Sequence, residues 1–193
     1  MKDKRPQLIF QNYDVISKFL VSVLETDVDR VIVNSKNTYE TVLEYLKKIG
    51  KENVEVVLNE NEDLTQMHDI AGQIEEMKER KIWLKCGGFI TIDKTEALTA
   101  IDINSGKFTG KKNSSKENTI YKVNQEATVE IAKQLRLRNI SGIIVIDYID
   151  MEEEKDRKNI MNLLEKELKK DRSKTQVMGF TKLDLLEMTR KKL

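Results

Sequence analysis

Residues 143–146 form an unbroken run of β-branched aliphatic side chains, and Asp147 follows directly. A short apolar run of this kind is typical of a strand that is covered on both faces. Residues 97–103 predict an earlier strand, and the apolar positions of residues 123–138 recur at helical spacing. A helix that connects two strands of one sheet makes those strands parallel. We therefore expect an α/β fold in which helices pack on a sheet.

Strand and helix patterns alternate along most of the chain. We expect helices near residues 15–24, 35–49, 70–77, 123–138 and 150–170, and strands at residues 30–34, 54–58, 81–85, 89–93, 97–103, 143–146, 175–178 and 185–188. The last of these segments is equally compatible with a helical turn. Gly50 is expected to cap the C-terminus of the second helix, and Asp150 the N-terminus of the last one. The polar segment 105–118 predicts a loop.

Gly87 and Gly88 interrupt this alternation, and we expect an internal boundary there. A length of 193 residues suits one compact unit or two small interlocked ones. The prediction is therefore two adjoining small α/β subdomains with mixed sheets and packed helices, over residues 1–86 and 87–193.

Composition excludes several classes of protein. No run of 18 or more apolar residues is present, so we expect no membrane-spanning helix. The charged N-terminal region does not show the pattern of a signal peptide. The only cysteine, Cys86, excludes an internal disulfide, and with the only histidine, His68, it excludes a zinc site of the Cys/His type. These features together predict a cytoplasmic protein.

The net charge of +1 hides an uneven distribution of charged residues. Acids dominate residues 52–80, bases dominate residues 166–192, and a further basic group surrounds the polar segment at residues 107–122. Basic patches on a neutral protein fit a polyanionic partner. Charge alone nevertheless favours the alternative, an ordinary solvated surface.

Three polar residues lie at the ends of the two predicted parallel strands. Asp102 and Asn104 are two positions apart, hence on one face, and Asp147 ends the strand at residues 143–146. The carboxyl ends of parallel strands meet at one edge of a sheet, where ligands bind in open α/β folds. Two carboxylates that converge there repel each other, and Mg²⁺ would relieve the repulsion. The alternative is that these acids cap the helices that follow.

Several long motifs of the chain, in the same order, resemble the ribonuclease E/G family. They are Gly87-Gly88, residues 95–106 (TEALTAIDINSG), 134–138 (QLRLR), 142–151 (GIIVIDYIDM), 170–172 (KDR) and 186–190 (LEMTR). The resemblance is dense over residues 83–190 and looser over residues 8–80. It implies part of a subdomain similar to ribonuclease H over residues 1–86, and a catalytic subdomain similar to deoxyribonuclease I over residues 87–193.

The resemblance also implies an activity. Asp102 and Asp147 would bind a catalytic Mg²⁺, which Mn²⁺ can replace, and Asn104 would support Asp102 as the third catalytic residue. The implied substrate is single-stranded RNA, cleaved during RNA processing and decay to leave a 5′-phosphate and a 3′-hydroxyl. We expect the RNA backbone to follow a basic track formed by Lys107, Lys111, Lys112, Arg172 and Lys174.

The sequence also departs from the family pattern. Family members normally carry an S1-type domain, a pocket that senses a 5′-monophosphate and a Cys-Pro-x-Cys zinc link that builds the oligomer. None of the three is visible here, and Lys174 stands in place of an RNA-contacting arginine. We therefore expect a slow endoribonuclease core that is indifferent to 5′-phosphorylation, and any homo-oligomer would lack the zinc-link cysteines. The alternative is a non-catalytic RNA-binding or assembly module with the same fold.

Overall fold

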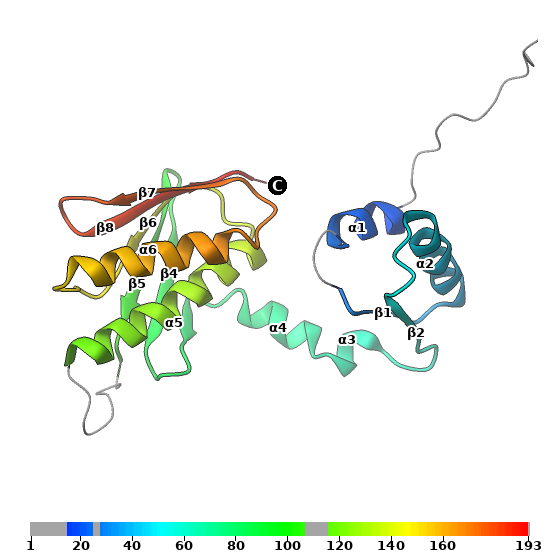
Figure 1. The fold of residues 1–193 in the computed structure, drawn as a ribbon. Helices are drawn as coiled ribbons and strands as arrows, with labels where there is room; N and C mark the ends of the chain where they lie inside the picture. Colours follow the sequence, from blue (N-terminus) through cyan, green and yellow to red (C-terminus); the bar gives the residue numbers. More distant parts are fainter. Residues whose placement is uncertain (1–14, 25–27, 107–115, 193) are drawn as a thin grey trace, which may run out of the picture. The chain divides into compact units, whose positions relative to one another are not determined.

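The computed structural model describes residues 15–24, 28–106 and 116–192 (Figure 1). The chain divides into two compact units, Met1–Gln73 and Ile74–Leu193. This division falls within helix α4 (Ile70–Glu76), N-terminal to the boundary predicted at Gly87. None of the helices in the described part of the chain is long and apolar enough to span a bilayer.

The first unit is a small helix-and-strand assembly. It contains α1 (Val15–Val23), β1 (Arg30–Val33), α2 (Lys36–Ile49), β2 (Glu55–Leu58) and α3 (Leu64–Met67). Strands β1 and β2 pair in parallel, as the connecting helix α2 requires. Helix α2 ends at Gly50, which has a left-handed φ of 69° and donates its N–H to the helix, so the predicted glycine C-cap is confirmed.

The second unit is built on a six-stranded mixed sheet with the order β3-β4-β5-β6-β8-β7. Its elements are β3 (Lys81–Trp83), β4 (Phe89–Lys94), β5 (Leu98–Asn104), α5 (Lys116–Leu137), β6 (Gly142–Asp147), α6 (Glu154–Leu168), β7 (Thr175–Phe180) and β8 (Leu185–Arg190). Strands β5 and β6 are parallel, and the other neighbouring pairs are antiparallel. The predicted α/β class and the parallel crossover through α5 are therefore confirmed.

Helices α5 and α6 lie side by side on one face of this sheet (Figure 1). Alternate strand residues, such as Ile101, Ile103 and Ile146, pack against the helices in the core. The inward positions predicted for α5 are all fully buried: Val123, Ala127, Ile131 and Leu135. Because side chains alternate along a strand, the residues between the buried ones face away from α5 and α6. We call this opposite side of the sheet the open face.

Three sequence-based expectations need correction. Strand β6 is not covered on both faces by its own unit, because Ile143 on the open face is 52% exposed. The N-cap of α6 is Glu153 and not Asp150, because residues 150–153 form a non-helical connection and the helix begins only at Glu154. The helical-turn alternative for residues 185–188 is wrong, because these residues form β8.

Candidate active site

Asp102 and Asp147 are register partners on the neighbouring parallel strands β5 and β6. The preceding pair, Ile101 and Ile146, is also in register, and both of its side chains are buried against the helices. The two aspartates therefore lie next to each other on the open face. Asp147 is the last residue of β6, which places the pair near the carboxyl edge predicted from the sequence.

The two carboxylates interact electrostatically. Partial burial raises the pKa of Asp147 above its ordinary value, and the negative charges of Asp102 and Asp150 raise it further. Asn104 donates a hydrogen bond from Nδ2 to Asp102 Oδ2 at 2.6 Å. The amide therefore holds one carboxylate in place, while the charges around Asp147 favour the arrival of a proton or a cation.

Helix α5 holds the chain segment that follows Asp147. Asn124, which is fully buried, donates from Nδ2 to the carbonyl oxygen of Ile149 at 2.8 Å and accepts at Oδ1 from the Ile149 N–H at 3.2 Å. One turn further along, Thr128 Oγ1 lies 3.0 Å from the buried hydroxyl of Tyr148. These contacts fix the end of β6. Sequence reasoning missed Asn124, although an asparagine beside the buried position of Val123 was the available signal.

Gly88 brings the start of β4 close to this site. A Cβ atom at Gly88 would lie 2.8 Å from the carbonyl oxygen of Asn104, which is closer than such atoms approach. Glycine is therefore required for β4 to begin beside the end of β5, and Gly87, with a φ of 95°, takes the turn that precedes it.

The oxygen atoms at this edge of the sheet are ligands of the kind that a hard divalent cation prefers. Among the described residues, no group of three or more His, Cys, Asp or Glu side chains is arranged to hold a metal ion. The paired Asp102 and Asp147 carboxylates, with the Asn104 amide beside them, offer a partial set of oxygen ligands. Mg²⁺ commonly binds through one or two carboxylates and completes its shell with water and phosphate oxygens. The residues present fit such an ion.

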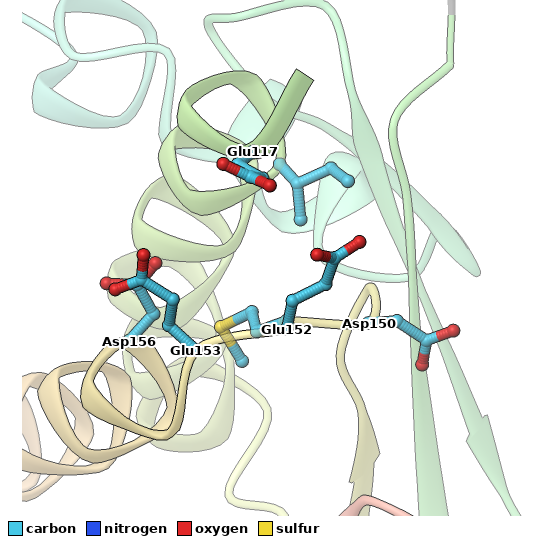
Figure 2. Close-up of a pocket in the computed structure, with 7 residues that line it drawn as sticks. Glu117, Asp150, Glu152, Glu153 and Asp156 are labelled. Atoms are coloured by element: carbon cyan, nitrogen blue, oxygen red, sulfur yellow. The ribbon is translucent and has the colours of Figure 1, made fainter. Parts of the chain in front are cut away.

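A cavity of about 350 Å³ lies between the start of α5 and the connection from β6 to α6 (Figure 2). It is lined by Glu117, Ile120, Asp150, Met151, Glu152, Glu153 and Asp156. Figure 2 shows Glu153 and Asp156 together at one side, while the Asp150 carboxylate points away from the other labelled acids. Five carboxylates around one cavity repel phosphate groups, so this surface disfavours an RNA backbone.

The structure describes only two residues of the predicted basic track, Arg172 and Lys174, and it does not place them beside the carboxylates. Lys107, Lys111 and Lys112 lie outside the described residues. Arg172 and Lys174 precede β7. The first residue of β7 pairs with Arg190, and Arg190 also pairs with Gly142 at the start of β6. Five residue steps of about 3.3 Å separate that end from Asp147, a length of about 16 Å.

A buried ion pair fixes this far end of the sheet. Arg190 Nε lies 2.7 Å from Asp171 Oδ2, with side chains 0% and 2% exposed. The same guanidinium donates to Asn139 Oδ1 and to the Ile140 carbonyl oxygen, each at 2.9 Å. Burial alone would raise the pKa of Asp171, but hydrogen bonds from Arg190 and the Ser173 N–H, with the charge of Arg190, hold it below its ordinary value. The pair therefore anchors the turn that carries Arg172 and Lys174.

Comparison with known proteins gives one consistent result. The sequence profile described as the Ribonuclease E/G family matches residues 1–193. Ribonuclease G of Salmonella typhimurium and ribonuclease G of Escherichia coli K12 are each 41% identical over 196 residues, covering 99% of this chain and 40% of theirs. Ribonuclease E of Nostoc sp. is 36% identical over 194 residues, covering 98% of this chain and 28% of its own. The chain thus spans less than half the length of these curated relatives.

Proposed function

Because the chain belongs to the ribonuclease E/G family, we propose that it is the catalytic core of an endoribonuclease that cleaves single-stranded RNA in the cytoplasm, during RNA processing and decay. The observation that carries the proposal is the register pairing of Asp102 with Asp147 on parallel strands, with Asn104 bonded to Asp102. The reaction would hydrolyse a phosphodiester, with water attacking phosphorus and the 3′ oxygen leaving. The products would be a 5′-phosphate and a 3′-hydroxyl.

In this proposal Asp102 and Asp147 hold Mg²⁺, or Mn²⁺ in its place. The ion when bound supplies a Lewis acid that neutralises charge on the phosphate and makes water more acidic. Asn104 keeps the Asp102 carboxylate oriented through its Nδ2–H. Asn124 holds the backbone of Ile149 and Thr128 contacts the Tyr148 hydroxyl, so the chain just beyond Asp147 is fixed and both carboxylates keep a fixed separation. A rigid pair of ligands matters because small displacements of a reacting group are costly in rate.

The decisive experiment incubates the protein with 5′-monophosphorylated single-stranded RNA and Mg²⁺. We expect cleavage products with 5′-phosphate ends, and we expect Asp102→Asn and Asp147→Asn each to abolish them. Glu165→Gln is the matched control, because Glu165 is an exposed carboxylate on α6, away from the open face. Cleavage that survives both aspartate substitutions would overturn the proposal. RNA binding without any metal-dependent cleavage would support the non-catalytic alternative.

A further inference from the structure

An aromatic pair, the exposed Trp83 and the half-buried Phe89, lies on the open face at its β3 side. The ring centroids of Trp83 and Phe89 are 5.3 Å apart, with an interplanar angle of 63°. The Lys81 ammonium nitrogen lies 3.9 Å from the Trp83 ring centroid and 3.6 Å from that of Phe89. Both contacts lie within the range of a cation–π interaction. The three side chains therefore form one surface cluster of two rings and a cation, which we call the aromatic cluster.

Strand register connects the aromatic cluster to the candidate active site. Trp83 pairs with Phe89, and Phe89 pairs with Asn104, so these three residues form a row across β3, β4 and β5. In the adjacent row, Lys81 pairs with Thr91, and Thr91 pairs with Asp102. Neighbouring strands lie about 4.8 Å apart, so Phe89 is one strand and Trp83 two strands from Asn104.

The core of the unit does not account for the aromatic cluster. Trp83 is 64% exposed, and neither Trp83 nor Phe89 is part of the hydrophobic core of the described residues. The neighbouring register pair, Ile82 with Ile90, points to the other face of the sheet. This pair supplies the core contacts of β3 and β4. An exposed tryptophan that contacts a half-buried phenylalanine outside the hydrophobic core points to a binding role.

We propose that Trp83 and Phe89 form a stacking surface for a base of the RNA strand whose phosphate reaches Asp102 and Asp147, with the Lys81 ammonium attracting the adjoining phosphate. This inference rests on the proposed function, because it assigns the aromatic cluster to the same substrate. Aromatic side chains bind single strands without sequence preference, since every base has a π face, and nearby cations attract the backbone. The positive charge of Lys81 beside two aromatic rings favours a nucleic acid as the occupant, because its bases can stack on the rings and its phosphates are attracted by the ammonium group.

Trp83 is the only tryptophan in the chain, so its fluorescence reports on the cluster without any substitution. The probe is a single-stranded oligoribonucleotide, added in EDTA so that no cleavage occurs, beside an abasic oligonucleotide of equal length and charge. We expect the base-containing strand to quench the tryptophan fluorescence and the abasic strand to leave it nearly unchanged. Equal responses to the two strands, or no response to either, would overturn the proposal.

Substitutions test the same point through affinity. Trp83→Ala should weaken binding of the base-containing strand by about tenfold or more while changing the abasic strand little, and Trp83→Phe should restore most of the loss. Met178→Ala is the control, because Met178 is an equally exposed apolar residue, on β7 (63%). Unchanged affinity in Trp83→Ala would overturn the stacking role. Quenching of Trp83 fluorescence without metal-dependent cleavage would support the stacking surface and refute the proposed endoribonuclease activity. Failure of the stacking proposal is therefore distinguishable from failure of the proposed function.

Discussion

Asn124 binds the backbone of Ile149 through both halves of its amide, two residues after Asp147. The side chain is fully buried in α5, so the bond joins the core of the unit to the end of β6. The position of the Asp147 carboxylate therefore depends on a residue that does not touch it.

Replacement of Asn124 by alanine should destabilise the fold and impair the site together. The N–H and carbonyl groups of Ile149 would lose buried partners, which costs about 1–3 kcal/mol each when they stay unsatisfied. We expect a lower free energy of unfolding in urea and a larger loss of cleavage rate than the stability change explains. Asn162→Ala, an exposed position on α6, should change neither quantity appreciably. A stable Asn124→Ala protein with full activity would show that the hydrogen bonds from Asn124 to the Ile149 backbone are not needed for stability or for the site.

The ion pair of Arg190 with Asp171 should be among the most sensitive positions for stability. Asp171→Asn leaves a buried guanidinium without its carboxylate, and breaking a buried pair costs about 3–5 kcal/mol. Asp184→Asn breaks the more exposed pair with Arg157 and should cost less than about 1 kcal/mol. Chemical denaturation of both variants measures the difference. Similar losses in the two would contradict the burial argument.

The same pair predicts a pH dependence. The pKa of Asp171 in the folded chain lies below its ordinary value of 3.8, so its contribution to stability is present above that value. The contribution is lost as the pH falls through the lower, folded pKa. Wild-type protein should therefore lose stability in acid more steeply than Asp171→Asn, as followed by thermal unfolding across that pH range. Parallel curves for the two proteins would refute the linkage.

Asp147 should titrate in the opposite sense. Its folded pKa is raised, first by burial and then by the charges of Asp102 and Asp150. The carboxylate therefore opposes folding as the pH rises from its unfolded to its folded pKa. Without divalent cations, Asp147→Asn should be more stable than wild type at neutral pH, by less than about 1 kcal/mol because water screens the site. In an NMR titration, Asp102→Asn should lower the pKa of Asp147 without returning it fully to normal.

Divalent cations should stabilise the wild-type chain. An ion that binds only the folded state raises the free energy of unfolding by about 2.7 kcal/mol at a hundred times its Kd. We expect Mg²⁺ to raise the melting temperature of wild type, and Asp102→Asn or Asp147→Asn to remove the increase. Glu165→Gln should respond as wild type does. Equal shifts in all four proteins would indicate nonspecific binding, for example at the acidic cavity around Glu152.

Local patterns were sufficient to predict much of the fold. The helical spacing of residues 123–138 between two strands required β5 and β6 to be parallel, and that topology placed Asp102 beside Asp147. Gly50 was recognisable as a cap because only glycine takes a left-handed φ without steric cost. These features depend on neighbours in sequence, or on a single crossover, and the residues themselves carry the information.

Contacts between distant segments were decided by the tertiary structure alone. Asn124 meets Ile149 because α5 packs over the end of β6. Helix α6 begins at Glu154, past the predicted cap Asp150. Trp83 joins the row of Asn104 through the register of β3 and β4, which no local pattern encodes. β8 runs antiparallel to β6 and pairs with β7, so Lys174 is placed at the end opposite Asp147. Strand order and register depend on how the whole sheet packs, whereas the periodicity of a segment depends only on its own side chains.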